Sequence, residues 1–420
     1  MGLMPQTPAF QDAARRIMAR CDELARYTSM EGGIERVYLS PEHARVNRLA
    51  SRWMREVGLD TWQDEAGNLN GHLDGKDPEA PSLLLGSHLD SVRDAGRYDG
   101  ILGVLMAIEV VRALKPRSKD LRFGLDVVAF WDEEGARFGT ALLGSSAMAG
   151  QWNPAWWDLT DEHGTSLRTA FREFGLDPGR VAAAARRPES LAGYLEAHIE
   201  QGPDLDRSNA PLGVVTSIAS ARRFSVQILG EARHAGGTRY EDRHDALLGA
   251  SEATLAVERL CRAEHHIVGT VGRLETFPGA VNVVPGEARL TVDLRGEHDD
   301  DRDRVWADIS RSIDEIAGRR GLRWNATQIH EAPAVWCDGL LQDVVRAGIE
   351  DTARGEAPSM FSRAGHDAMA IGAITGVGML FLRNPDGISH HPDESVSLAD
   401  VETGLRAMTA TVEHLAREAA

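Results

Sequence analysis

The chain has 420 residues, of which 42% are hydrophobic and 26% are charged, and its formal net charge is −18. Single cores stop growing at roughly 250–300 residues, so this length predicts two domains. The acidic balance argues against nucleic acid and anionic membranes as partners, because both need basic patches on the protein. It leaves open an anionic substrate, which needs only a few arginines in one place.

The cysteines and the first residues bear on the location of the protein. Cys21, Cys261 and Cys337 are scattered, odd in number and without Cys-x-x-Cys spacing, which favours free thiols in a reducing compartment. The stretch MGLMPQTPAFQDAARRIMARC has no apolar region typical of a secretory signal. No run of residues approaches the roughly 20 apolar positions of a membrane span. We therefore expect a cytoplasmic protein.

The first block of the chain alternates strands and helices. SLLLGSH at residues 82–88 predicts a buried strand, and a helix is predicted over 100–114. Further strands are predicted over 122–131 and 193–199. Continuous apolar strands that alternate with helices are typical of a parallel or mixed sheet covered on both faces. This block therefore predicts an α/β domain.

Residues 214–329 follow a different pattern. RRFSVQILGE at 222–231 alternates apolar and polar positions, as a strand with one buried face does. A helix, two strands, a charged helix and a last strand are predicted over 244–262, 266–275, 281–296, 302–319 and 322–329. The order β-α-β-β-α-β is that of the split ferredoxin-like unit. It predicts a compact α+β domain inserted into the first domain.

After residue 330 the first pattern returns. Helices are predicted over 339–353, briefly after GHDA, and over 398–417, while GMLFL at 378–382 predicts a buried strand. We therefore expect a discontinuous α/β domain of residues 1–213 and 330–420, which the domain of 214–329 interrupts. Its sheet should be mixed, mostly parallel and covered by helices.

Histidines or acids follow each predicted strand of the α/β domain or precede its first predicted helix. They are His88 and Asp90 in GSHLDS, Asp99 in RYDG, Asp132, Glu133 and Glu134 in WDEEG, His198 and Glu200 in AHIEQG, and His390 and His391 in SHHPDE. Each motif alone is typical of a polar turn or a helix cap. In open α/β sheets, however, ligands bind beyond the carboxyl ends of the strands. Imidazoles and carboxylates gathered there without lysines need a cation to neutralise them.

The ligand types indicate which metals fit. Histidine and carboxylate ligands without a thiolate suit Zn²⁺, Mn²⁺ or Co²⁺. Three imidazoles and two carboxylates exceed what one tetrahedral catalytic ion with an open position uses. They suffice for two ions about 3.5–4 Å apart that share a bridging carboxylate. The sequence therefore predicts two divalent metal ions per subunit, of open identity.

The motifs occur together in one order: GSHLDSV, GRYDGILGV, WDEEGARFG, EAHIEQGP, RHAGG, AVNVVP, DLR, GHDA and ISHHPDE. As an ordered set they resemble the metal-dependent aminoacylase and carboxypeptidase superfamily. Within it, they resemble the branch of N-carbamoyl-L-amino-acid hydrolases and allantoate amidohydrolases, over nearly the whole chain. The resemblance implies a zinc-aminopeptidase-like catalytic domain with an inserted lid or dimerisation domain. It also implies a homodimer that forms through the inserted domain.

The resemblance further implies which residues hold the metal ions. Asp99 looks like the carboxylate that bridges them. His88 and His198 would complete one metal site, and Glu134 and His390 the other. The second histidine of the SHHPDE motif stands where the family tolerates other residues.

Glu133 and His234 are the catalytic residues that the resemblance implies. Glu133 looks like the general base, and His234 in RHAGG would donate to the developing oxyanion, from its own or from a partner subunit. Considered alone, His234 precedes a Gly-Gly turn and would have only a local role there. Asp90 looks like the acid that orients the imidazole of His88.

Four residues look like substrate contacts in the family. They are Gln201 in HIEQG and, in the inserted domain, Arg223, Asn282 and Arg295. An arginine fork grips a carboxylate with two hydrogen bonds, and an amide orients it. Considered alone, the two arginines are equally typical of exposed strand positions. The resemblance thus implies a small-molecule substrate with a free carboxylate.

The implied function is hydrolysis of a linear amide C–N bond. The enzyme would cleave the carbamoyl group of N-carbamoyl-L-amino acids or of allantoate and release ammonia and carbon dioxide. An aminoacylase or dipeptidase of the same superfamily is the alternative, although AHIEQG has His198 where peptidase relatives carry a carboxylate. A catalytically inactive binding protein is a third reading, against which the complete ligand set speaks. Two departures from the family pattern leave the substrate open. Arg363 stands where a small residue is common, and the cluster of Trp152, Trp156 and Trp157 is unusual. We expect this cluster to pack at a domain junction, with the lining of a substrate pocket as the alternative.

Overall fold

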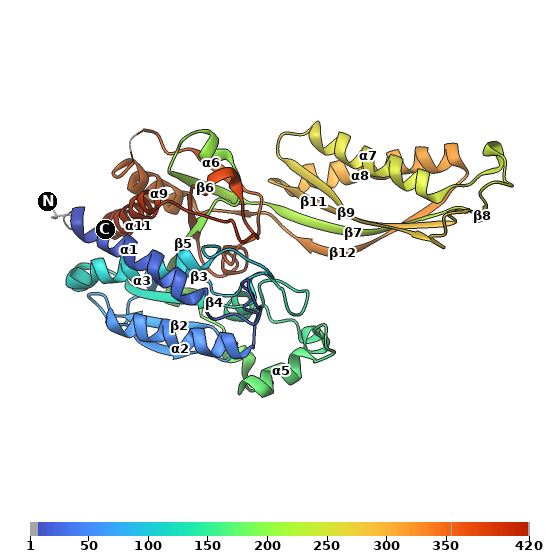
Figure 1. Cartoon of the computed structure of the whole chain (residues 1–420). Coiled ribbons are helices and arrows are strands. Elements are labelled where there is room, and N and C mark those ends of the chain that lie inside the picture. The colour runs from blue at the N-terminus through green and yellow to red at the C-terminus, as the bar shows by residue number, and fades with distance from the viewer. Residues whose placement is uncertain (1–6, 354, 419–420) are drawn as a thin grey trace. The chain divides into compact units, whose positions relative to one another are not determined.

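The computed structural model describes residues 7–353 and 355–418, which form two compact units (Figure 1). The large unit consists of the chain up to Thr216, of Trp336–Met360 and of the chain from His366, and the small unit consists of Ser217–Val335 and Phe361–Gly365. The sequence placed the inserted domain at 214–329 and did not indicate that residues 361–365 join it. Ala219 N donates to Ser362 O at 2.8 Å, which ties this short segment to the small unit.

A nine-stranded sheet forms the centre of the large unit. Its strands lie in the order β1 (Asp60–Gln63), β2 (Leu69–Leu73), β4 (Gly124–Phe130), β3 (Ser82–His88), β5 (Leu191–Ile199), β15 (Val377–Leu382), β6 (Leu212–Ile218) and β13 (Val335–Trp336), with β14 (Ser359–Ser362) paired to β6. The central strands β4, β3, β5 and β15 are parallel to one another, whereas β2 pairs antiparallel with β4 and β6 pairs antiparallel with β15. β3 and β4 are buried along their whole length, as their continuous apolar sequence requires.

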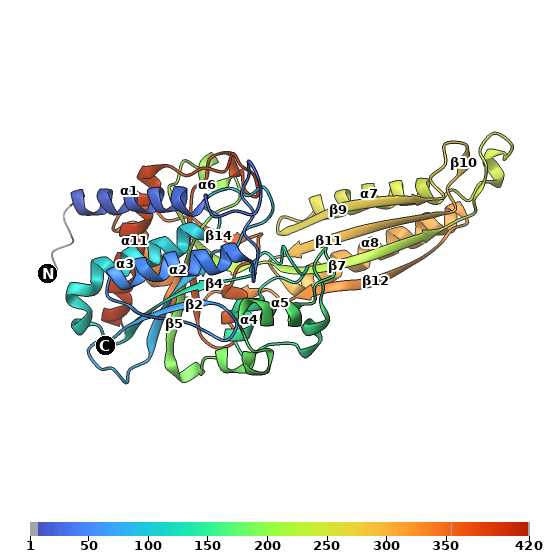
Figure 2. The same cartoon turned by 60° about the horizontal axis from the view of Figure 1, so that its bottom comes forward.

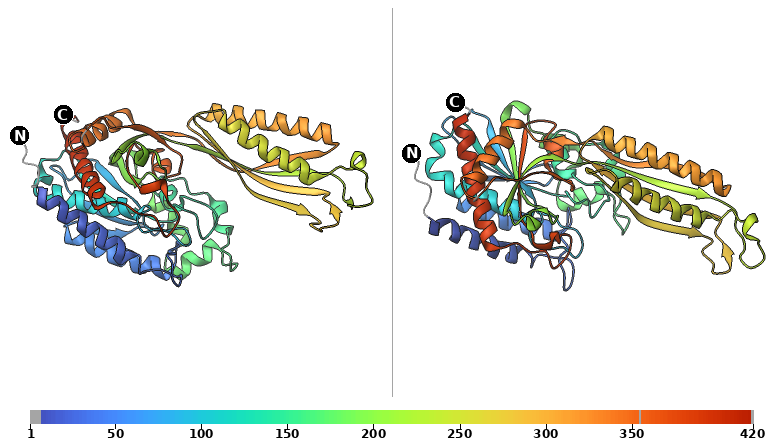
Figure 3. Two further views of the ribbon diagram at one scale, coloured as in Figure 1. Left: turned by 45° about the horizontal axis from the view of Figure 1, so that its top comes forward. Right: turned by 90° about the horizontal axis from the view of Figure 1, so that it is seen from above.

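Helices cover this sheet. The helices of the large unit are α1 (Thr7–Leu24), α2 (Pro41–Glu56), α3 (Ile101–Leu114), α4 (Leu143–Met148), α5 (Leu167–Phe174), α6 (Asp204–Arg207), α9 (Gly339–Glu350), α10 (Ala368–Ile371) and α11 (Leu398–Glu418). The strongly apolar α3 packs on β3, β4 and β5, and the C-terminal α11 packs against α9, α3 and α1 (Figure 3). The predicted α/β class, with a mostly parallel sheet covered by helices, is confirmed. None of the helices among the described residues is long and apolar enough to cross a membrane.

The small unit contains a four-stranded antiparallel sheet with two helices on one face. The strands lie in the order β12 (Arg323–Ala332), β7 (Ser220–Leu229), β11 (Glu287–Gly296) and β9 (Ile267–Phe277), and the helices are α7 (Ala246–Arg262) and α8 (Asp299–Arg320). Phe224, Val226 and Ile228 alternate along β7 and share one core with both helices. β8 (Arg233–His234) and β10 (Val283–Val284) form a separate pair, with β10 labelled in Figure 2. The chain order of these elements is the β-α-β-β-α-β of the sequence prediction.

The three tryptophans between residues 152 and 157 form an aromatic cluster within the large unit. The ring of Trp152 lies 4.8 Å from that of Trp157 and 5.3 Å from that of Trp156, and Trp157 lies 4.8 Å from Phe171 on α5. These partners all belong to the core of the large unit or pack against it. Packing inside this unit therefore accounts for the cluster, and its expected place at a domain junction stays a prediction.

A charged group links β2 to β4 in the same sheet. His72 stands opposite Asp126 across the two strands, and its Nδ1 lies 2.6 Å from Asp126 Oδ1. His72 Nε2 lies 3.1 Å from Asp74 Oδ1, and Arg186 Nη2 donates to the second oxygen of Asp126 at 2.8 Å. The hydrogen bond with Asp126 raises the pKa of His72 to about 9. The imidazolium is therefore more stable in the folded protein than in the unfolded chain, where the pKa of histidine is about 6.5.

This shift predicts a pH-dependent stability. A raised folded-state pKa adds stability that is complete below about pH 6.5 and is lost as the pH rises through about 9. Relative to His72→Gln, the wild-type protein should be more stable by on the order of 1 kcal/mol at pH 6, because solvent screens this partly exposed pair. Urea unfolding of both proteins from pH 6 to 10 measures this difference. A difference that stays constant across the range would contradict the assigned pair.

Candidate active site

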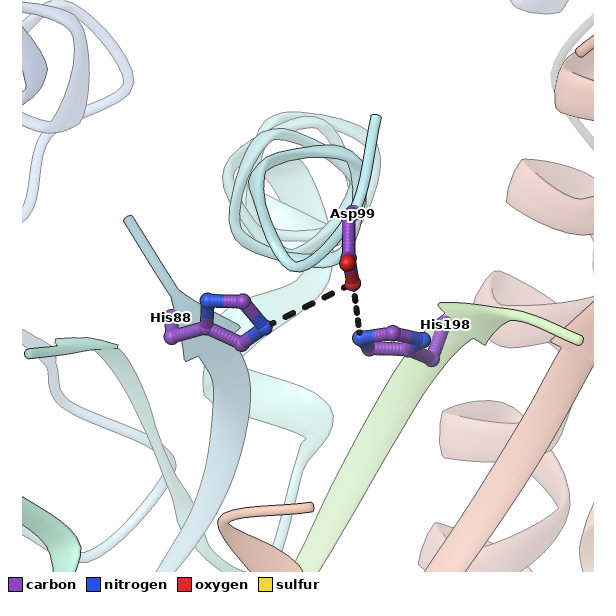
Figure 4. A group of neighbouring side chains, drawn as sticks. All are labelled: His88, Asp99 and His198. Atoms are coloured by element: carbon purple, nitrogen blue, oxygen red, sulfur yellow. Dashed lines mark ion pairs between the residues drawn. The ribbon is translucent and has the colours of Figure 1, made fainter. Parts of the chain in front are cut away.

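Three buried side chains meet at the carboxyl ends of two parallel strands. His88 ends β3, His198 lies near the end of β5, and Asp99 stands just before α3 (Figure 4). Asp99 Oδ1 lies 3.2 Å from His198 Nε2 and 3.8 Å from His88 Nε2. Relative exposure is 1% for each histidine and 4% for Asp99. The adjacency of β3 and β5 thus brings together residues that are 110 positions apart in the chain.

The other oxygen of Asp99 belongs to a second group. Asp99 Oδ2 lies 3.1 Å from His390 Nε2, and Glu134 Oε1 lies 3.1 Å from the same nitrogen. Glu134 follows β4 and His390 follows β15, so this group also forms at the carboxyl edge of the parallel strands. The structure therefore brings all five predicted metal ligands together. Asp99 directs one oxygen to each group, which is the arrangement that a bridging carboxylate needs.

Two observations show that these residues fit a divalent cation. Asp99 Oδ1 and His198 Nε2 are buried and face each other, yet neither forms a hydrogen bond of good geometry. Polar atoms that converge without bonding one another are typical of ligands around a shared ion. The second observation is Gly100, whose φ is +68° and where a Cβ would stand 2.3 Å from His88 Nε2. A side chain there would fill the space in front of the imidazole, so glycine keeps that nitrogen accessible.

The electrostatics of the group also fit a cation. Burial opposes ionisation of Asp99, but contacts with His198 and His390 hold its pKa well below the usual value. Burial would lower the pKa of His198, yet Asp99 raises it to about 9, and Asp99 with Glu134 raises the pKa of His390 to about 10. In the metal-free protein the two imidazoles thus take up protons to neutralise the acids. A metal ligand must be deprotonated, so a divalent cation would take the place of these protons.

Glu133, the predicted base, lies beside this group. It is 8% exposed, and ligand atoms of His88, Glu133 and Glu134 lie within 4.8 Å of one another. Burial raises the pKa of Glu133 well above its usual value, and the neighbouring Glu134 adds to the effect. Both effects favour the protonated form, which a proton carrier in hydrolysis must be able to take up.

Asp90 has two partners besides the His88 imidazole that the sequence predicted for it. Its Oδ1 accepts from Glu133 N and its Oδ2 from Glu134 N, each at 3.2 Å. His88 Nδ1 lies 3.2 Å from the main-chain oxygen of Asp90 and 3.6 Å from Oδ1. The carboxylate therefore fixes the backbone of the Glu133–Glu134 pair, and the main chain of Asp90 contacts the imidazole. The reason is that the turn after β4 offers two unpaired N–H groups, which a carboxylate satisfies together.

Gln201 and Glu394 support the second group. Gln201 Nε2 donates to Asp99 Oδ2 at 3.0 Å and lies 3.3 Å from His390 Nε2, so this predicted substrate contact touches two predicted ligands. Glu394 Oε1 accepts from Tyr98 N at 2.8 Å and from Asp99 N at 3.1 Å. Sequence reasoning missed this role of Glu394, although the residue stands in the SHHPDE motif.

A third set of buried residues lies next to His198. Ligand atoms of Glu196, His198 and His366 lie within 4.8 Å of one another, and all three residues are buried. Glu196 Oε1 accepts from Ser87 Oγ at 2.7 Å, and Oε2 accepts from Ala368 N at 3.3 Å. Glu196 and His366 were not among the predicted site residues. The GHDA motif was the available signal for His366, and no signal existed for Glu196 beyond its place two residues before His198.

The substrate residues predicted in the inserted domain form two pairs. Arg223 Nε and Arg295 Nη2 each lie 3.3 Å from Asp293 Oδ2, on the sheet face opposite α7 and α8. His234 stands opposite Val283 in the β8–β10 pair. The neighbouring residues also pair, since Ala235 N donates to the main-chain oxygen of Asn282. His234 is exposed, and its Nδ1 accepts from Gly237 N, which is the local turn role considered from the sequence. Its catalytic role stays a prediction.

Comparison with known proteins places the chain in a family. Residues 69–414 match Peptidase family M20/M25/M40. The chain is 36% identical to "Allantoate deiminase 2" of Glycine max, over 95% of this chain and 89% of that protein. It is 37% identical to "N-carbamoyl-L-amino-acid amidohydrolase" of Pseudomonas sp. (strain NS671), over 90% and 92%. A crystal structure of "Amidase, hydantoinase/carbamoylase family" from Burkholderia multivorans has a TM-score of 0.88 at 30% identity, over 96% of this chain and 98% of that chain.

These similarities agree with the geometry of the site. The match covers most of the chain and includes both units, and the relatives carry the two activity names that the motifs indicated. The resemblance stated from the sequence is therefore confirmed. The chain belongs to Peptidase family M20/M25/M40, a family of metal-dependent hydrolases, and resembles its N-carbamoyl-L-amino-acid amidohydrolase and allantoate deiminase members.

Proposed function

We propose that the protein cleaves the carbamoyl C–N bond of N-carbamoyl-L-amino acids or of allantoate, with release of ammonia and carbon dioxide. The observation that carries this proposal is the double contact of Asp99, which offers one oxygen to His88 and His198 and the other to His390 beside Glu134. The names of relatives at 36% and 37% identity supply the bond type.

In this proposal two divalent ions bind, one to each group of ligands. His88, His198 and Asp99 would hold the first ion, and Glu134, His390 and Asp99 would hold the second. When bound, such ions polarise a carbonyl oxygen and supply an activated water near neutral pH. Zn²⁺, Mn²⁺ and Co²⁺ all suit this set of imidazole and carboxylate ligands.

Glu133 acts as the general base and then as the acid. It accepts a proton from the attacking water and passes it to the leaving nitrogen. Its burial supports this role, because a carboxyl group kept from water favours the protonated form between the two steps. The hydrogen bond from its own N–H to Asp90 fixes the position of the residue.

The remaining predicted residues bind substrate. Arg223 and Arg295 grip the free carboxylate, which Asn282 orients, and both arginines already point to a carboxylate, that of Asp293. Gln201 contacts the ureido group from its place beside Asp99. His234 donates to the developing oxyanion. We further propose that the small unit forms the interface of a homodimer, and that His234 acts in its own or in the partner subunit.

The first test is a substrate panel with added Mn²⁺, Co²⁺ or Zn²⁺. Allantoate and N-carbamoyl-L-amino acids should release ammonia, and chelation should abolish that release. N-acetyl amino acids and a dipeptide, scored by the free amino acid formed, should react at least about tenfold more slowly. Faster cleavage of these two would favour the aminoacylase or dipeptidase alternative. Chelator-resistant turnover would refute metal dependence.

The second test is Glu133→Gln. The variant should bind metal like the wild-type protein, because its ligands are unchanged, and its kcat should fall about 10²- to 10⁴-fold because the proton carrier is lost. Glu173→Gln changes an exposed glutamate on α5 and serves as the control that keeps full activity. A kcat within threefold of wild type for Glu133→Gln would show that another group is the base.

The third test is Arg295→Ala. A lost charged hydrogen bond to a carboxylate costs about 2–4 kcal/mol, so kcat/KM should fall about 30- to 1,000-fold for substrates with a free carboxylate. An analogue with a carboxamide in that place should lose much less. Arg289→Ala is the matched control, since Arg289 is an exposed arginine on the same strand and the same face. Equal losses on both substrates would contradict a carboxylate clamp.

A further inference from the structure

The segment before α2 runs beside the loop that connects two predicted metal ligands. Residues 89–98 lie between His88 and Asp99 in the sequence. Ala95 N donates to Ile34 O, and Ser91 N donates to Arg36 O, each at 3.0 Å. Arg36 N donates in return to Ser91 Oγ at 3.0 Å. Three main-chain groups of residues 34–36 thus hold this loop at two places.

The side chain of Arg36 adds a second set of bonds. Its Nε donates to Leu89 O at 2.6 Å, and its Nη1 lies 3.1 Å from Leu24 O and 3.3 Å from Tyr27 O. Arg36 is 1% exposed, and no carboxylate of the described residues lies within ion-pair distance of its guanidinium. Burial lowers the pKa of Arg36 to about 10, so the group stays charged at neutral pH. A buried cation bonded only to carbonyl groups is costly to keep. The shortest of its three bonds ends on Leu89 O in the loop after β3, and the other two end on Leu24 and Tyr27 at the end of α1.

The bond to Leu89 lies between two groups of the candidate site. The residue before Leu89 is His88, and the residue after it is Asp90, whose main-chain oxygen contacts His88 Nδ1. The Asp90 carboxylate accepts from the N–H groups of Glu133 and Glu134. A rotation of the Leu89 peptide would therefore displace the predicted ligand His88 on one side. On the other side it would displace Asp90, which holds the backbone of the predicted base and of the ligand that follows it.

From this geometry we infer that Arg36 is a positioning residue of the metal site: its guanidinium fixes the Leu89 peptide and thereby both His88 and the Glu133–Glu134 backbone. The inference rests on the proposed function for the metal ions themselves. A planar guanidinium bonds in fixed directions to several carbonyl groups at once. A lysine keeps the charge but has one rotatable ammonium, so it cannot hold the same three carbonyl groups in the same way.

The test compares Arg36→Lys, Arg36→Met and Ser91→Ala with the wild-type chain. Each protein is stripped with chelator and titrated with Mn²⁺ by calorimetry, the Tm of the stripped protein is measured, and kcat and KM are determined after metal is restored. Arg302→Lys is the matched control. Arg302 is the other fully buried arginine among the described residues, 2% exposed, and it bonds to Asp299 and Ala332 O within the small unit.

Arg36→Lys should weaken Mn²⁺ binding about 10- to 100-fold, as loss of a group that supports metal ligands does. It should lower kcat more than it changes KM. Arg36→Met should weaken binding at least as much, and Ser91→Ala by a smaller factor in the same direction. Arg302→Lys should lower Tm and leave Mn²⁺ affinity unchanged.

Unchanged Mn²⁺ affinity in Arg36→Lys, with a lowered Tm like that of Arg302→Lys, would reduce Arg36 to a structural residue and overturn the inference. If neither Arg36 variant folds, Ser91→Ala decides, and wild-type affinity in that variant overturns the inference as well. If the wild-type chain itself binds no Mn²⁺, Co²⁺ or Zn²⁺, the proposed function fails first, so the two failures are distinguishable.

Discussion

The arrangement of the predicted metal ligands depends on the carboxylate of Asp99. This carboxylate lies between three imidazoles and is itself almost fully buried. Glu133 and Glu134 lie close to the same place, and their pKa values are raised first by burial and then by neighbouring acids. So many buried acids repel one another unless positive charge compensates them. In the metal-free protein, protonated histidines provide this positive charge. The fold thus keeps these acids and imidazoles together at a cost in free energy that divalent ions would remove. In the proposed function, metal binding would therefore stabilise the fold as well as supply the chemistry.

Carboxylates outside the ligand set hold this arrangement through the backbone. Asp90 accepts from the N–H groups of Glu133 and Glu134, and Glu394 accepts from the N–H groups of Tyr98 and Asp99. In both cases one carboxylate satisfies two successive amides at a turn that carries a predicted ligand. Such bonds fix a side chain through its own main chain and leave its donor atoms free for a metal ion. Bonds to the ligand atoms themselves would compete with that ion.

The strand ends could be predicted from the sequence because their physical signal is local. Buried parallel strands are continuous apolar runs, so SLLLGSH and its counterparts show where each strand stops and which residue follows. The partners of Asp90, Gln201 and Glu394 gave no such signal, since they depend on the directions of turn amides and side chains that periodicity does not encode. The attachment of residues 361–365 to the small unit was missed for the same reason. Arg36 was missed because an arginine before a helix is usually exposed, and its burial follows only from tertiary contacts.

The arginine pair on the small unit shows how an internal carboxylate can prepare a binding site. Arg223 and Arg295 share one oxygen of Asp293, while the other oxygen of Asp293 is buried and has no hydrogen bond among the described residues. Asp293 therefore keeps two long side chains in one orientation before any substrate arrives, which lowers the entropy lost on binding. In the proposed function a substrate carboxylate must compete with Asp293 for the same donors, so only the difference between the two interactions contributes to affinity. A group that offers two oxygens in the plane of a guanidinium wins that competition, whereas a carboxamide, with one acceptor and no charge, does not. In the proposed function the clamp would therefore favour a carboxylate that replaces Asp293, and the strength of the Asp293 interaction would set how large that preference is.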